Sequence, residues 1–332
     1  MTTRGKWLLF AAVLGAALVV PELLLRAFGF EYRSGVQFGF PDPSRMAFFA
    51  SDPRLFWKLK PAADPTHVRA DVDGNSHGFQ GADPAIPKPG GTYRMLYLGD
   101  SCTFQGYPWR AADRMRDLKI PADRTAETVS LAIPGYTSLQ GLRAAEDYGL
   151  ELDPDVVFVY FGWNDHWAAY GSIDSKKVAP RPRPFEDLRL VQATAWLLAR
   201  KRPPLDEPRV LPEEYRENLS AIAALFSARK IPVVFITAPT TFYTLGVPEK
   251  LVEDRFAKSG DEAIRLHREY NAIVREVAGK SGARLLDLET ECEASPGLAT
   301  WFMKDGIHFS PTGRDWMADR IARFVREDLL RE

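Results

Sequence analysis

The sequence predicts an α/β protein: a three-layer α/β/α sandwich with a five-stranded parallel sheet, preceded by an N-terminal transmembrane helix. From Tyr93 onward, short apolar runs alternate with segments of helical period, which is typical of a parallel sheet covered by helices on both faces. The first 28 residues contain an apolar stretch long enough to cross a bilayer. A hydrophobic content of 45% in 332 residues can fill the core of such a domain and excludes a disordered chain.

The first 28 residues are interpreted as a membrane anchor or a signal segment. Arg4 and Lys6 precede Trp7–Val20, a run of fourteen residues without a charge. As a helix, Trp7–Leu25 would be about 28 Å long, close to the roughly 30 Å hydrocarbon core of a bilayer. The small residues Gly15–Ala17 leave a cleaved signal peptide as the alternative. In both cases the positive N-terminus predicts that the following chain is exported to the periplasmic or extracellular side, and it would be secreted after cleavage.

Residues 29–92 are predicted to be an N-terminal extension of loops and short strands, because they are rich in Pro, Gly, Asp and Phe and lack a sustained helical period. The main domain would then occupy residues 93–332. Within the extension, Asp71–Asn75 places oxygen ligands at alternate positions, as a calcium loop does. The required Gly and Glu further along such a loop are missing, so we predict no metal there.

Five apolar runs of the main domain have the length and composition of buried strands. They are Met95–Leu98, Val129–Ala132, Val156–Phe161, Val233–Ile236 and Leu285–Leu288, and helical segments lie between them near 109–117, 138–149, 212–229 and 261–279. A last helix is expected to follow Ser310, which is a good N-cap, with Pro311 at the first helical position. This alternation predicts the parallel sheet.

An insertion at about 166–211 interrupts the alternation. Between Lys176 and Arg209 the sequence has nine basic and four acidic residues, an excess that could face anionic lipid or an acidic polymer, or belong to a solvated loop. Leu188–Leu198 could form a short helix that either exposes Trp196 and Leu197 as a lid or packs on the core, and we expect packing.

The charge and the cysteine content exclude several classes of function. The net charge of -1, from 43 basic and 44 acidic residues, argues against nucleic-acid binding. Cys102 and Cys292 are the only cysteines, which gives no metal-ligand spacing and no disulfide framework and leaves open whether the two pair. His267 lacks a partner pattern and lies in a charged helical segment, so we expect it at the surface. No metal or cofactor is predicted, and the sequence leaves protein partners open.

Reactive residue types stand just after the predicted strands, where the loops of a parallel sheet meet in one crevice. A serine hydroxyl is a weak nucleophile until an imidazole accepts its proton, and His308 can be that base for Ser101. Asp305 can hold the other ring nitrogen, fixing the tautomer and stabilising the imidazolium. The predicted catalytic residues are therefore Ser101, Asp305 and His308.

An oxyanion hole is predicted from three donors on separate loops. The negative charge that develops on an ester carbonyl needs preorganised hydrogen bonds. The candidates are the backbone N–H groups of Ser101 and Gly135 and the side-chain amide of Asn164. Glycine suits position 135 because no side chain would obstruct an approaching substrate.

These residues resemble the SGNH hydrolase family, also called GDSL esterases. Ser101 in a Gly-Asp-Ser block, Gly135, Asn164 in a Gly-x-Asn-Asp block and His308 in an Asp-x-x-His block follow the family's order, and the resemblance covers residues 93–332. It implies a flavodoxin-like three-layer fold and an esterase, lipase, thioesterase or carbohydrate acyl-esterase activity that needs no metal. The Gly-x-Ser-x-Gly string of the sequence, Gly74–Gly78, lies in the predicted extension and not between a strand and a helix of the main domain, which argues against the α/β-hydrolase fold.

Two details refine the resemblance. Position 102 is Cys where the family usually has a bulky apolar residue, and the segment after Asn164 is long. Gly74–Phe79 is similar to the preamble of membrane-anchored, exported bacterial members, which supports an envelope location and a membrane partner through the N-terminal helix.

Side chains beside the blocks have structural alternatives. Asp100 is expected to cap the next helix and Asp165 to bond nearby backbone, in preference to catalytic roles. Trp163, His166 and Trp167 either line the substrate pocket or pack within their loop.

The leading hypothesis is a serine esterase that hydrolyses an O-acetyl or longer acyl ester on an envelope glycan, lipid or small exported substrate. An O-acyltransferase that passes the acyl group to a sugar hydroxyl would use the same residues, and exclusion of water would separate the two. The non-enzyme alternative is an inactive glycan-binding relic.

Overall fold

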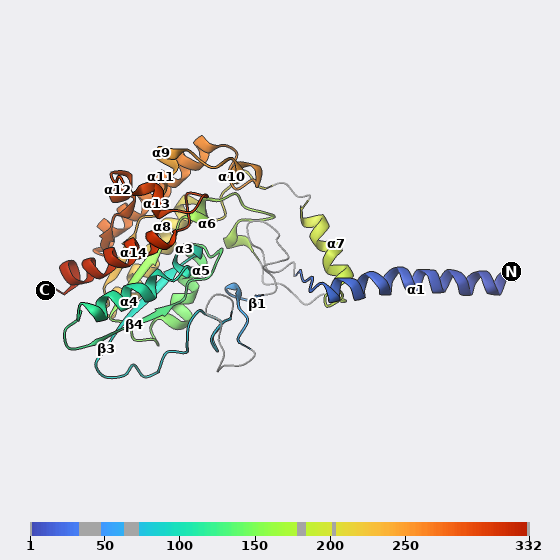
Figure 1. The fold of residues 1–332 in the computed structure, drawn as a ribbon, viewed down its shortest axis with the longest axis horizontal. Coiled ribbons are helices and arrows are strands. Elements are labelled where there is room, and N and C mark those ends of the chain that lie inside the picture. Colours follow the sequence, from blue (N-terminus) through green and yellow to red (C-terminus); the bar gives the residue numbers. More distant parts are fainter. Residues whose placement is uncertain (1, 33–47, 63–72, 178–183, 201–203, 331–332) are drawn as a thin grey trace.

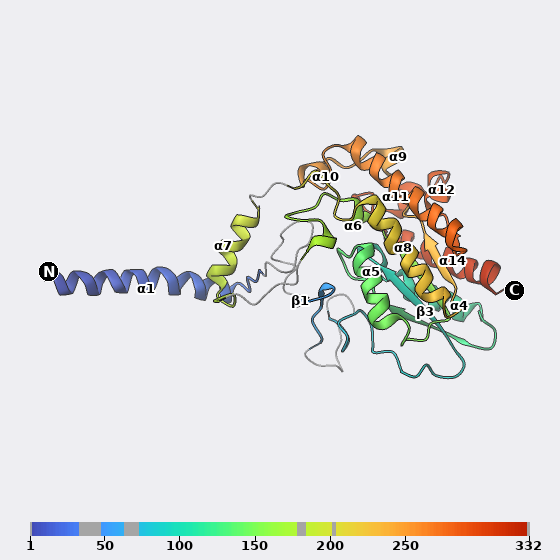
Figure 2. The same ribbon diagram turned by 180° about the vertical axis from the view of Figure 1, so that it is seen from behind.

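The computed structural model describes residues 2–32, 48–62, 73–177, 184–200 and 204–330. Helix α1 (Thr3–Ala27) projects from a globular body formed by the main domain (Figure 1 and Figure 2). None of its residues is buried, and its length and apolar composition would let it cross a membrane. A signal sequence near an N-terminus meets the same description, so α1 is a candidate for either.

The five predicted strands form one parallel sheet in the order β4-β3-β5-β6-β7, which confirms the predicted α/β class. Their bounds are β3 Thr92–Gly99, β4 Thr125–Ser130, β5 Val156–Tyr160, β6 Val233–Ile236 and β7 Arg284–Leu286. Strand β4 begins at Thr125 rather than Val129, because it lies at the sheet edge, where strand residues need not be apolar.

Helices cover both faces of the sheet, which confirms the three-layer sandwich. Leu96 and Leu98 of β3 belong to the hydrophobic cluster that includes α8 and α11, and Met95 and Tyr97 belong to the cluster that includes α4 and α14. The long helices are α4 Tyr107–Asp117, α5 Ser138–Ala144 with its π-helical continuation Ala145–Gly149, α8 Pro212–Ser227, α11 Gly260–Ser281 and α14 Pro311–Phe324 with its π-helical continuation Val325–Leu329.

Short helices complete the layers and lie mostly in the loops. They are α3 Ser101–Phe104, α6 Trp163–His166, a 3-10 turn at Asp174–Lys176, α9 Phe242–Leu245, α10 Glu249–Glu253, α12 Leu288–Glu293 and α13 Leu298–Trp301. At the last long helix, the side chain of Ser310 accepts a hydrogen bond from the Gly313 backbone, which confirms the predicted N-cap.

The described part of the extension packs onto the main domain. It contains an antiparallel pair of strands, β1 (Phe49–Asp52) and β2 (Phe56–Leu59). The Trp57 side chain is fully buried in the same cluster as Leu96 of β3. The extension therefore shares a core with the sheet. Its bounds, residues 29–92, remain a prediction.

The described part of the insertion contains α7 (Arg189–Arg200), close to the predicted helix. The Trp196 ring lies edge-on to Phe30 with 5.9 Å between ring centroids, whereas Leu197 is exposed. One side of α7 therefore packs, as expected, and the other faces outward. Four of the basic residues counted in the insertion, Arg181, Arg183, Lys201 and Arg202, lie outside the described residues.

Candidate active site

Ser101 is the first residue of α3, two positions after the last residue of strand β3. The carboxylate of Asp100 caps this helix by accepting a hydrogen bond from the Cys102 backbone N–H at 2.9 Å, which confirms its predicted capping role. Asp100 is buried, and burial raises its pKa to about 6. The turn also requires Gly99, because a Cβ there would lie 2.2 Å from Thr103 Oγ1. The local sequence thus holds the Ser101 hydroxyl at the carboxyl edge of the sheet.

The loop before α14 brings Asp305 and His308 to that hydroxyl. His308 Nε2 lies 2.8 Å from Ser101 Oγ, and His308 Nδ1 lies 2.7 Å from Asp305 Oδ2. Since a carboxylate can only accept here, Nδ1 carries the proton and Nε2 is free to accept one. The three side chains are partly exposed, so a substrate can reach them.

Asp305 is held by more than the imidazole. Its Oδ1 accepts hydrogen bonds from the backbone N–H groups of Ile307 and His308, each at 2.9 Å. Burial acts to raise the pKa of Asp305, but the hydrogen bonds from His308 and the backbone outweigh it and lower that pKa. Gly306, with φ of 70°, permits the tight turn between the two residues.

A glutamine not singled out from the sequence joins the two loops. Gln105 Oε1 accepts from the Phe309 backbone N–H at 2.8 Å, and Gln105 Nε2 donates to the Phe309 carbonyl at 3.3 Å. This double contact fixes α3 against the residue that follows His308. Its partner is 204 residues away in the chain, so local sequence gives no signal for it.

Asn164 and Gly135 lie on the loops after β5 and β4. Asn164 Nδ2 is 3.0 Å from the Tyr136 carbonyl and 3.4 Å from Asp100 Oδ2, so the blocks of Ser101 and Asn164 are in contact. Gly135 has a φ of 84°, a backbone conformation that favours glycine. Asn164 and Gly135 are both partly exposed.

A buried ion cluster holds the Gly135 loop from the side of the insertion. Arg209 Nη1 donates to the Gly135 carbonyl at 2.8 Å, and Arg209 Nη2 is 2.9 Å from Asp174 Oδ2. Lys177 pairs with the same carboxylate. Burial acts to raise the pKa of Asp174, but Arg209 and Lys177 outweigh it and lower that pKa. Two of the basic residues counted in the insertion are therefore buried partners in this cluster.

The extension also holds the Gly135 loop. Trp57 Nε1 donates to the Pro134 carbonyl at 3.2 Å, and Tyr136 Oη donates to the Trp57 carbonyl at 2.6 Å. The two residues that flank Gly135 are thus bonded to β2. Neither this contact nor the ion cluster was predicted, since the partners are far apart in sequence.

Asp165 has the structural role that was expected. Its carboxylate accepts hydrogen bonds from the Ser138 backbone at 2.8 Å and from the Gly162 backbone at 3.2 Å. The side chain is buried, and burial raises its pKa to about 7. Asp165 therefore joins the loop of Asn164 to the start of α5.

Trp163, His166 and Trp167 form a buried cluster with His267, and the expectation of a surface position for His267 is wrong. His267 is 1% exposed, stacks on Trp163 with 3.9 Å between centroids and lies 3.1 Å from His166 Nε2. The charged residues of α11 are on its outer side, whereas His267 is on the side that faces the sheet. Of the two alternatives given for Trp163, His166 and Trp167, this structure shows packing within their loop.

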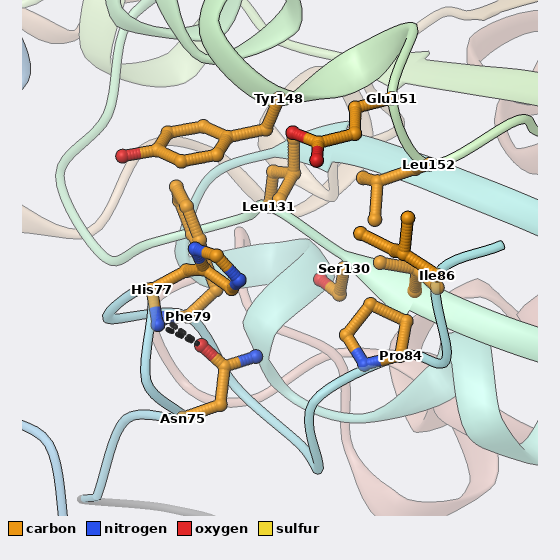
Figure 3. A pocket seen from close by; sticks show the side chains of 11 residues that line it. Asn75, His77, Phe79, Pro84, Ile86, Ser130, Leu131, Tyr148, Glu151 and Leu152 are labelled. Atoms are coloured by element: carbon orange, nitrogen blue, oxygen red, sulfur yellow. Dashed lines mark hydrogen bonds between the residues drawn. The ribbon is translucent and has the colours of Figure 1, made fainter.

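The remaining candidate features lie outside the group of predicted catalytic residues. Cys102 and Cys292 are both buried and unpaired. Among the described residues, no group of His, Cys, Asp and Glu could hold a metal ion. A small pocket lies between Asn75–Ile86 of the extension, the end of β4 and Tyr148–Leu152 (Figure 3). No predicted catalytic residue lines it.

Several known proteins are similar to this chain. A family model described as the GDSL-like Lipase/Acylhydrolase family matches residues 97–316. A lipase/acylhydrolase from Enterococcus faecalis is 18% identical over 70% of this chain and 95% of its own, with a TM-score of 0.49. A GDSL-like lipase from Bacteroides thetaiotaomicron is 16% identical over 71% and 88%, with a TM-score of 0.46. A psychrotrophic esterase from Pseudoalteromonas sp. is 14% identical over 71% and 98%, with a TM-score of 0.44. No curated protein matches the chain.

Proposed function

This chain belongs to the GDSL-like lipase/acylhydrolase family and is an ester hydrolase, and on that premise we propose that Ser101 is its nucleophile. The observation that carries the proposal is the continuous chain of hydrogen bonds from Ser101 Oγ through His308 to Asp305, at 2.8 and 2.7 Å. Such a chain lets the imidazole take the hydroxyl proton while the carboxylate stabilises the imidazolium.

In the first half of the proposed reaction, Ser101 Oγ attacks the ester carbonyl and His308 Nε2 accepts the hydroxyl proton. The tetrahedral oxyanion then receives hydrogen bonds from the backbone N–H groups of Ser101 and Gly135 and from the Asn164 amide, and one such donor is worth about 10²- to 10³-fold in kcat. Asn164 has two N–H groups, and its contact with Asp100 at 3.4 Å is the weaker one, so that N–H can turn to the oxyanion.

His308 then protonates the leaving alcohol, and its departure leaves the acyl-serine. In the second half, His308 takes a proton from a water molecule that attacks the acyl carbonyl, and it returns this proton to Ser101 Oγ as the acid is released. We propose that the substrate is an O-acetyl or longer acyl ester on an envelope glycan, lipid or small exported molecule. The exposed apolar helix α1 supports this location, with the main domain on the exported side as a membrane-anchored protein. The assembled side chains favour an active enzyme over a glycan-binding relic.

The test is hydrolysis of p-nitrophenyl esters from acetyl to dodecanoyl by the full chain in detergent. Ser101→Ala should reduce turnover by about 10⁶-fold or to background. The matched control is Ser220→Ala, which removes an exposed serine whose hydroxyl bonds only its own helix in α8. Undiminished turnover by Ser101→Ala would contradict the proposal. Adding glycan acceptors to the same assay separates hydrolysis from acyl transfer, because a transferase would form an acylated glycan in place of the free acid.

A further inference from the structure

We propose that α7 is an interfacial helix whose exposed apolar side lies on the lipid bilayer, so that the main domain contacts the membrane at a second point beside α1. This inference rests on the membrane-spanning role proposed above for α1, and it does not depend on the proposed catalytic roles. It rests on the exposed residues of α7, on the contacts that orient this helix and on its attachment to the end of α1.

The outward side of α7 is apolar. Val191 is 42% exposed, Leu197 53% and Leu198 60%, and the helical period places all three on the side of α7 away from Gln192. The exposed Thr194 lies between them. Soluble surfaces rarely gather apolar side chains in this way without a protein or membrane partner.

The opposite side of α7 is fixed to the protein, so the apolar face has a defined direction. Gln192 is buried, and its Oε1 accepts a hydrogen bond from the Tyr32 backbone at 3.1 Å. Gln192 Nε2 also donates to the Glu186 carbonyl at 2.8 Å. Together with the packing of Trp196 on Phe30, these contacts prevent α7 from rotating to hide its leucines.

The start of α7 is bonded to the last turns of α1. Glu22 Oε2 accepts from the Leu190 backbone N–H at 2.8 Å, and Arg26 Nη2 donates to the Asp187 carbonyl at 3.0 Å. Glu22 and Arg26 are also paired with each other at 2.7 Å. Figure 1 shows α7 crossing the direction of α1 at its domain end. When α1 spans a bilayer, α7 therefore lies along the surface where α1 leaves it.

Continuity with α1 identifies lipid as the occupant. Phe28, at the end of α1, is 84% exposed, and Phe185, before α7, is 73% exposed. Two more exposed apolar side chains therefore lie in the chain next to the junction of α1 and α7. A helix with an apolar face and basic neighbours is typical of binding at the boundary of headgroups and acyl chains. In the sequence, two arginines precede α7 and a Lys-Arg pair follows it.

The test uses the full chain in nanodiscs of phosphatidylcholine and phosphatidylglycerol, with a nitroxide label on Leu198→Cys. Its collision rates with oxygen, which dissolves in lipid, and with a nickel chelate, which stays in water, report where the label lies. The control is Leu245→Cys on α9, which is 65% exposed at a part of the body remote from α1 (Figure 1). Both native cysteines are buried, and an unlabelled parent gives the background.

We expect the label at 198 to collide more with oxygen than with nickel, and the label at 245 to show the reverse. Equal nickel access at both positions would overturn the proposal. So would shielding of position 198 from both reagents, which would indicate a second copy or another protein surface. Circular dichroism melts of each labelled protein verify folding without use of the esterase assay, so failure of this proposal and failure of the catalytic one stay distinguishable.

Discussion

Two histidine sites near the same edge of the sheet differ in what surrounds the ring. The His308 side chain is 31% exposed and lies between a carboxylate and a hydroxyl. His267 is 1% exposed and lies between another histidine and the Ala238 carbonyl, at 3.1 and 2.8 Å. Burial lowers the pKa of His267 to about 4, so this ring stays neutral at physiological pH. Exposure and a carboxylate partner, rather than the presence of histidine, therefore distinguish the proposed catalytic base from the buried ring.

The largest effect expected from this comparison is on activity at His308. His308→Asn removes the proposed base, and kcat should fall by about 10⁴-fold or more, as loss of a triad histidine does elsewhere. The thermal midpoint should change little, because the ring is partly exposed and packs on a surface loop. Hydrolysis of p-nitrophenyl acetate and a calorimetric melt measure the two quantities. If the variant kept full turnover, His308 would not be the base, and the two histidine sites would not differ in their role.

Arg209 lies between these extremes, since it is buried like His267 but bonded to the loop of a proposed oxyanion donor. Arg209→Gln leaves the Asp174 carboxylate paired only with Lys177 and should cost about 3 kcal/mol of unfolding free energy. If Gly135 donates to the oxyanion, kcat should also fall by roughly tenfold or more, with a smaller change in KM. Urea titration and steady-state kinetics test both parts. Lost stability with unchanged kcat would limit Arg209 to a structural role.

His267→Phe should reverse the pattern expected of His308→Asn. The new ring can still stack on Trp163, but His166 Nε2 loses its partner, so the unfolding free energy should fall by about 1–3 kcal/mol. Turnover per folded molecule should stay within about tenfold of the parent. Urea titration and kinetics on the folded fraction provide the measurement. A collapse of kcat without loss of stability would assign the buried pair to catalysis.

The smallest expected effect is a difference in pH dependence. His267 stays neutral in the folded protein down to about pH 4, whereas the unfolded chain binds a proton below about 6.5, so this ring removes stability as pH falls through that window. The loss reaches about 3 kcal/mol at most. Asp100 and Asp165, with pKa values raised by burial to about 6 and 7, act in the opposite direction.

The comparison with His267→Phe isolates the histidine contribution, because both aspartates remain in the variant. The stability advantage of the parent over the variant should shrink as pH is lowered from 7 to 4. Urea titrations of both proteins at each pH give this difference. An advantage that is constant or grows at low pH would show that His267 is not held neutral.

The predictable parts of this protein depend on short stretches of chain. The Asp305 to His308 contact joins residues three positions apart, and Ser101 follows a strand whose apolar run is unmistakable. The sequence could therefore place these residues together. The ion cluster of Arg209 could not be predicted, because its partners lie 35 and 74 residues away and its charges are typical of a solvated loop until the fold buries them.

His267 was misplaced for a related reason. Its neighbours in α11 are charged, and an amphipathic helix has charged residues beside buried ones at every turn. Only the position of the sheet decides which side of such a helix is covered. The observed start of β4 lies before the predicted one because an edge strand needs few apolar residues. The apolar run therefore predicted where β4 ends but not where it begins.

The contacts of Trp57 have a practical consequence for recombinant expression. A gene trimmed to residues 97–316 would cut β3 in its middle, since that strand starts at Thr92, and would remove the end of α14. It would also delete Trp57, which bonds the residues on both sides of Gly135. Such a fragment could retain every proposed catalytic side chain and still be poorly folded or inactive, so shortened versions for crystallography should keep the hairpin of β1 and β2.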